Sequence, residues 1–106
     1  MACGLPVIAT NYFAIPEMVE DGRSGLLIDT ALFDCERLFR GYVVKSIPEE
    51  FHEYMSEQVY EKLCLLLESE SLRKKMGEAG REIVQSRFSV RKRNARMREI
   101  YEETLA

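Results

Sequence analysis

The segment Ala2–Thr10 constrains the fold more than any other part of the chain. Gly4 has the left-handed backbone freedom that a helix end needs, and Pro6 follows it closely enough to stop the helix. The apolar run Leu5–Ala9 then predicts a short strand covered on both faces. Because only Met1–Cys3 precede the helix end, too few residues to nucleate a helix, we expect a chain that continues a longer protein.

A short helix and a second strand are expected after Thr10. Pro16 is tolerated in the first turn of a helix over Ile15–Val19, and Gly22 is available as its stop. Gly25–Ile28 is a second apolar strand. A strand, a crossover with a helix and another strand form a βαβ unit, whose strands pair in parallel. The predicted fold class is therefore α/β, opening on a partial Rossmann-like parallel sheet.

Residues after position 55 change to a helical period and predict three C-terminal helices. Their apolar stripes are Val59, Leu63, Leu66 and Leu67; Leu72, Met76, Ala79 and Ile83; and Val90, Asn94, Met97, Tyr101 and Leu105. N-caps are expected at Ser56, at Ser69 or Ser71, and at Ser89, with an interruption or kink at Gly80. We expect the stripes to lie in the core, because each helix must bury one face.

Several sequence blocks, in the right order, resemble one family of enzymes. They are ACGLPVIAT (residues 2–10), IPEMVEDG (15–22), SGLLI (24–28), LRKKMGEAGRE (72–82) and RFS (87–89). Together they resemble the C-terminal domain of group 1 glycosyltransferases, retaining enzymes of the GT-B fold that use nucleotide sugars. The resemblance covers residues 1–29 and roughly 56–106, so the chain is interpreted as a truncated GT-B C-terminal domain.

The resemblance implies transfer of a sugar from a nucleotide sugar to an acceptor hydroxyl, with retention and with no cofactor or metal. In the family, a pair of glutamates holds the donor, but both would lie upstream of Met1, as would the N-terminal domain that binds the acceptor. No catalytic residue can therefore be carried onto this chain, which we expect to be inactive alone. The alternative is a non-catalytic binding or regulatory module that docks onto another subunit.

Residues 30–55 depart from the family and are interpreted as an atypical insertion between the βαβ unit (1–29) and the helical tail (56–106). Ala31–Arg40 predicts an amphipathic helix and Gly41–Lys45 a short strand. Ser46 followed by Glu49 has the spacing of a capping box, which predicts a helix starting near Ile47. The segment is either an elaborated surface loop or an interaction element, since its aromatics are many for solvent: Phe33, Phe39, Tyr42 and Phe51.

Thr10 and Asn11 are the candidate substrate-binding residues. Ligands of open parallel sheets bind beyond the carboxyl ends of the strands, where a hydroxyl and an amide can bond sugar hydroxyls or phosphate oxygens. The alternative is that Thr10 ends the strand and Asn11 starts a turn. Phe13 and Ala14 stand where family members often carry two glycines, which weakens the case for a close backbone approach.

Other charged residues are better explained without chemistry. Glu17 lies in the first turn of a short helix, where the helix dipole stabilises its charge. Gly77 and Gly80 lie inside a helical pattern and follow no strand, so they do not form a phosphate loop. The basic cluster is mixed with glutamates and predicts a solvated or interdomain helix face rather than a nucleic-acid helix: Arg91, Lys92, Arg93, Arg96 and Arg98.

Composition agrees with an ordinary globular protein in a reducing compartment. The chain has 106 residues, of which 46% are hydrophobic and 31% charged, and a net charge of −3, which gives no attraction to nucleic acid. Cys3, Cys35 and Cys64 are too widely spaced for a zinc site and are interpreted as apolar packing residues. The lone His52 has no predicted role in catalysis. We expect a cytoplasmic location, with membrane association through the longer protein and a homodimer both left open.

Overall fold

Two parallel strands form the sheet in the computed structural model, which describes residues 1–33 and 47–106. β1 spans Val7–Thr10, β2 spans Gly25–Ile28, and the short helix α1 (Ile15–Met18) lies between them in sequence. The strands pair in register from Val7↔Gly25 to Thr10↔Ile28, which confirms the βαβ unit and the α/β class. β1 begins at Val7 rather than Leu5 because the preceding proline has no N–H to pair.

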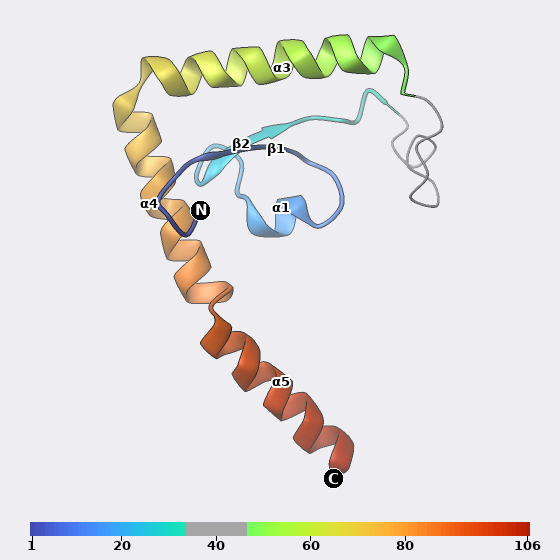
Figure 1. Cartoon of the computed structure of the whole chain (residues 1–106), viewed down its shortest axis with the longest axis vertical. Helices are drawn as coiled ribbons and strands as arrows, with labels where there is room; N and C mark the ends of the chain where they lie inside the picture. Colours follow the sequence, from blue (N-terminus) through green and yellow to red (C-terminus); the bar gives the residue numbers. More distant parts are fainter. Residues whose placement is uncertain (34–46) are drawn as a thin grey trace.

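Three helices follow, as expected: α3 (Glu49–Glu68), α4 (Glu70–Arg87) and α5 (Val90–Leu105). α3 contacts both strands, and α4 contacts α3 and β2. Figure 1 shows α3 and α1 on opposite sides of the sheet, with α4 running past the N-terminal segment and α5 extending away from the strands. Because the strands are parallel, their carboxyl ends lie at the same edge of the sheet.

Two of the three predicted N-caps are confirmed. The hydroxyl of Ser69 accepts a hydrogen bond from the backbone N–H of Leu72 at 3.2 Å, and that of Ser89 accepts one from Lys92 at 3.2 Å. The prediction for Ser56 is wrong, because α3 already begins at Glu49. No helix breaker lies between Glu49 and Ser56, and the acidic first turn suits the helix dipole, so the helix extends through that position.

The apolar stripe of α4 is confirmed as core. Met76 and Ile83 are 2% and 3% exposed, and they lie in a small core with Val19, Ile28 and Leu66. α4 is continuous through Gly80, so the interruption expected there is wrong. A Cβ at this position would lie 3.5 Å from the side chain of Met1, an ordinary van der Waals contact.

The stripes of α3 and α5 are largely wrong as core predictions. On α3 only Leu66 is buried, whereas Leu63 and Leu67 are 46% and 67% exposed. The buried and half-buried residues of α3 lie mainly on a different face from the predicted stripe: Phe51, Tyr54, Met55, Gln58, Lys62 and Leu66. α5 has no buried residue. Two short strands cover too little helix surface to bury both apolar faces.

Residues 30–55 are described in part. Ala31 and Leu32 form a turn rather than the start of the helix expected over Ala31–Arg40. Phe33 packs against Phe51, with ring centroids 5.1 Å apart, so these two aromatics contact each other. The remaining predictions lie outside the described residues: the rest of that helix, the strand over 41–45, the capping serine Ser46, and Cys35, Phe39 and Tyr42.

The described cysteines are free thiols in different surroundings. Cys64 is half-buried on α3, in line with a packing role. Cys3 is exposed, which contradicts that role. It lies in the turn closed by the hydrogen bond from the Gly4 N–H to the Met1 carbonyl at 2.9 Å. Met1 and Gly4 of this turn lie against α4.

Candidate functional site

The carboxyl ends of β1 and β2 place a cluster of polar residues at one edge of the sheet. Thr10 and Ile28 are paired, so Asn11 lies next to Asp29 and Thr30. The backbone N–H of Asn11 donates to the carbonyl of Ile28 at 3.0 Å and extends the ladder by one bond. Tyr54 reaches this edge from α3, and its hydroxyl donates to the carbonyl of Asp29 at 2.6 Å. The structure thus brings the candidate residues to the edge where ligands of such sheets bind.

The side chain of Asn11 joins the two strand ends. Its Oδ1 accepts from the backbone N–H of Thr30 at 3.0 Å and from the Thr30 hydroxyl at 2.9 Å. Its Nδ2 donates to Oδ1 of Asp29 at 3.2 Å. These bonds use both lone pairs of the amide oxygen and one of the two N–H donors. Asn11 is therefore chiefly a structural clamp. Among residues 1–33 and 47–106, these bonds leave the second N–H donor of its amide for a ligand that approaches this edge.

Thr10 is placed differently from its neighbour. It is the last residue of β1 and is half-buried. A hydroxyl at the end of a strand can donate to, or accept from, a polar ligand.

Phe13 carries backbone strain in the loop that follows β1. Its φ is 53°, in the left-handed region that a side chain with a Cβ rarely adopts. The ring is 69% exposed and packs edge-on against Tyr12, with centroids 4.3 Å apart. A glycine would meet this backbone geometry without strain.

The strain at Phe13 predicts a reversal between two adjacent positions. We expect Phe13→Gly to be more stable than Phe13→Ala by about 1 kcal/mol, because both lose the ring and only alanine keeps the strain. At Ala14, whose φ is −84°, Ala14→Gly should instead lower the free energy of unfolding by roughly 0.5 kcal/mol. Urea unfolding of the variants measures both differences. If the same residue, glycine or alanine, gave the higher free energy of unfolding at both positions, the strain at Phe13 would be refuted.

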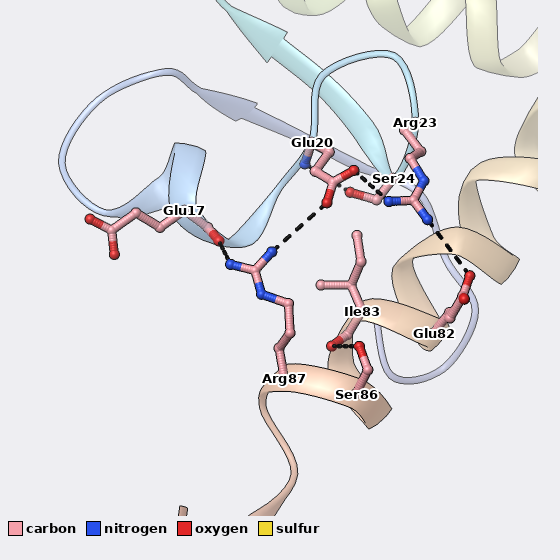
Figure 2. A network of polar contacts seen from close by, with 8 residues as sticks. All are labelled: Glu17, Glu20, Arg23, Ser24, Glu82, Ile83, Ser86 and Arg87. Carbon is pink, nitrogen blue, oxygen red and sulfur yellow. Dashed lines mark hydrogen bonds and ion pairs between the residues drawn. The ribbon is translucent and has the colours of Figure 1, made fainter. Parts of the chain in front are cut away.

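A second polar cluster, shown in Figure 2, ties α1 and the following turn to α4. Arg23 donates to Oε2 of Glu20 at 2.6 Å and lies 3.7 Å from a carboxylate oxygen of Glu82. The hydrogen bond to Glu20 and the charge of that carboxylate raise the pKa of the Arg23 guanidinium. Arg87 reaches the same cluster from the end of α4 and donates to the backbone carbonyl of Glu17 at 2.8 Å.

Glu17 therefore contacts α4 through its backbone carbonyl. Its carboxylate points away from the other labelled residues in Figure 2. Glu17 is exposed on α1, in agreement with a structural role in the first turn of that helix. Arg87 and Glu20 were not singled out from the sequence. Arg87 contacts Glu17 and Glu20, which lie on or next to another element and cannot be found from a local pattern. The RFS block (87–89) was the only sequence feature that included Arg87.

Three residues of the basic cluster, Lys92, Arg93 and Arg96, line a groove at the junction of α4 and α5. A cavity of about 440 Å³ is bounded by Arg87, Phe88, Lys92, Arg93, Arg96 and Met97. Arg96 pairs with Glu99 at 3.0 Å, and Lys92 donates to the carbonyl of Ser86 at the end of α4. Arg96 and Lys92 are therefore already paired with groups of the chain itself. None of the residues that line the groove belongs to the polar edge of the sheet, so the two are separate features of the surface.

The part of the chain that the structure describes has neither a metal-binding cluster nor a membrane-spanning helix. Across residues 1–33 and 47–106, no group of three or more His, Cys, Asp or Glu is placed to hold a metal ion. Within the same ranges, no helix combines the length and the apolar character that a membrane span needs.

The βαβ unit lies in a segment that is similar to a known protein family. The family model described as glycosyl transferases group 1 matches residues 1–51, which contain β1, α1 and β2. The first half of this chain is thus similar to the group 1 glycosyl transferases. The chain is also 34% identical, over 97% of its length, to a protein of Methanocaldococcus jannaschii named an uncharacterized glycosyltransferase. No solved structure matches the chain significantly.

The match to the archaeal glycosyltransferase extends beyond the family model into the helices. It covers 103 residues of this chain but only 22% of the relative, so the chain spans about a fifth of that protein's length. Sequence similarity to glycosyltransferases therefore includes α3, α4 and α5 as well as the βαβ unit.

Proposed function

We propose that this chain forms part of the donor-side domain of a GT-B glycosyltransferase. The longer protein would transfer a sugar from a nucleotide sugar to an acceptor hydroxyl, with retention of the anomeric configuration. The observation that carries the proposal is the group 1 match over β1, α1 and β2, whose carboxyl edge presents Thr10. The similarity of the helical half to the archaeal glycosyltransferase supports it independently.

Thr10 is proposed to contact the donor. Its hydroxyl lies at the carboxyl end of β1, where ligands of parallel sheets bind. Asn11 is proposed to contribute its second N–H donor while its oxygen holds Thr30. A cytoplasmic location, a requirement for no cofactor and a homodimer of the chain stay predictions.

The isolated chain is proposed to be inactive. Positioning of the donor and the acceptor supplies much of the catalysis of such reactions. We expect the 106-residue chain to show no sugar transfer and to bind nucleotide sugars no tighter than millimolar by calorimetric titration. The full product of the gene should show both transfer and tighter binding. Micromolar binding by the chain alone would mean that these residues build a complete donor site.

Replacing Thr10 tests the proposed contact in the full product of the gene. Thr10→Ala should reduce kcat/KM for the nucleotide sugar roughly tenfold, the loss of about one useful hydrogen bond. Thr104→Ala, which removes a hydroxyl from the exposed end of α5, is the matched control and should leave the rate unchanged. Initial-rate kinetics with both variants measure the effect. Equal rates for the two variants would remove Thr10 from the donor site.

A docking module is the second candidate function. α5 has no buried residue, and several of its apolar side chains are exposed, among them Tyr101 at 60% and Leu105 at 86%. A helix with an uncovered apolar stripe is favoured where another surface covers it. Sugar transfer by the full gene product would decide for the enzyme, and stable capture of a partner without any transfer would decide for the module.

A further inference from the structure

The helix α1 cannot hold its own position. It spans one turn, Ile15–Met18, and none of its residues is buried. A single turn gains too little from its hydrogen bonds to offset the entropy of ordering it. The loop between β1 and α1 carries the strained Phe13, which also opposes the folded conformation. Contacts with the rest of the chain must therefore fix α1.

Arg87 supplies such a contact. Its guanidinium donates to the carbonyl of Glu17 at 2.8 Å, an interaction that satisfies one of the carbonyls left unpaired at the end of a helix. A cation in this position also complements the helix dipole. The same guanidinium lies 3.8 Å from Oε1 of Glu20, in the turn that follows α1.

The neighbours of Arg87 hold it in place. The guanidinium carbon lies 5.2 Å from the centre of the Phe88 ring, within the range of a cation–π contact. Glu20 accepts from Arg23, so one carboxylate is shared by two arginines. Figure 2 shows Arg87 and Arg23 approaching this carboxylate from different elements. The side chain of Arg87 is 49% exposed, so we assign the main effect to the charged hydrogen bond with Glu17 rather than to the ion pair.

We propose that Arg87 is a positioning residue that fixes α1 and, through it, the loop following Thr10. This inference rests on the proposed function, because the loop borders the edge at which the donor would bind. The RFS block then has a physical explanation for each residue. Arg87 holds α1, Phe88 packs against the guanidinium, and Ser89 caps α5.

Hydrogen exchange in the isolated chain tests the contact without any assay of sugar transfer. The amide of Val19 donates to the carbonyl of Ile15 at 2.9 Å, so its exchange rate reports on the formation of α1. Arg87→Ala should accelerate this exchange about tenfold. Arg87→Lys keeps one charged donor and should return the rate to within about threefold of the parent. Arg81→Ala removes another exposed arginine from α4 and is the matched control.

The pattern of exchange separates positioning from general stability. Acceleration confined to residues 15–19, with α4 unchanged at Met76–Ile83, is the expected result. An unchanged Val19 rate in Arg87→Ala, or equal acceleration throughout α4, would overturn the proposal.

Kinetics of the full gene product extend the test to the proposed function. Arg87→Ala should raise KM for the nucleotide sugar about tenfold and lower kcat less, because the loop would be ordered only on binding. A parent protein without sugar transfer would refute the proposed function and leave the exchange result standing. Wild-type kinetics in Arg87→Ala, with faster Val19 exchange, would overturn the positioning of the donor edge.

Discussion

Gly77→Ala should lower the free energy of unfolding by about 2 kcal/mol and the melting temperature by roughly 10 °C. Gly77 lies inside α4, where alanine is intrinsically favoured over glycine by about 1 kcal/mol. A Cβ at this position would lie 2.0 Å from the carbonyl oxygen of Gly4 and 2.7 Å from its carbonyl carbon. Since backbone atoms cannot rotate away like a side chain, the turn over residues 1–4 must leave α4, and the clash outweighs the gain in helix propensity.

Gly80→Ala is the matched control, because it is the same substitution at another buried glycine of α4. Its Cβ would meet the side chain of Met1 at 3.5 Å, an ordinary van der Waals contact. Helix propensity then decides, and we expect Gly80→Ala to be neutral or to stabilise the protein by up to about 1 kcal/mol. Thermal and urea unfolding measure both variants. Similar effects of both substitutions would show that Gly77 does not hold the N-terminal turn against the helix.

Asn11→Ala should destabilise the protein by about 2 kcal/mol, more than one lost surface hydrogen bond would cost. The reason is Thr30, which is 5% exposed and donates from its backbone N–H to Oδ1 of Asn11. Alanine removes this acceptor and leaves the buried donor to find another. Asp29 would lose the donor from Nδ2 at the same time, and the two strand ends would part.

Asn94→Ala is the control for the loss of an amide. Asn94 lies on the exposed helix α5 and accepts from Arg93 at 3.2 Å. Its removal should change the free energy of unfolding by less than about 0.5 kcal/mol. Urea unfolding compares the two variants, and amide exchange at Thr30 localises the effect of Asn11→Ala. A stability loss no larger than that of Asn94→Ala would contradict the clamp.

The wrong predictions for the helices share one physical cause. Val59, Leu63 and Leu67 fit the helical period, yet they are between 41% and 67% exposed on α3. The period shows that residues share a face and does not show which surface that face meets. Ser56 likewise has the chemistry of an N-cap, but α3 extends through it from Glu49. Burial and helix starts depend on neighbouring elements, and a local pattern contains no information about them.

Predictions succeeded where the physics is local. Apolar runs gave β1 and β2, and the helix expected between them gave their parallel pairing. Ser69 and Ser89 bond to the backbone three residues ahead, as N-caps do. The carboxyl edge of the sheet could also be assigned to Thr10 and Asn11, because strand direction alone decides which end of a parallel pair they occupy.

The amino-acid sequence by itself determined the α/β class, the order of the elements and the residues at the sheet edge, because these follow from period, turn chemistry and strand direction. Only the tertiary structure decided three contacts. Asn11 accepts from the backbone of Thr30, Gly77 leaves space for the backbone of Gly4, and Arg87 donates to the carbonyl of Glu17. These partners lie on different elements, and Arg87 and Glu17 are 70 residues apart. Such contacts form when elements pack, and their geometry is set by how closely whole elements approach.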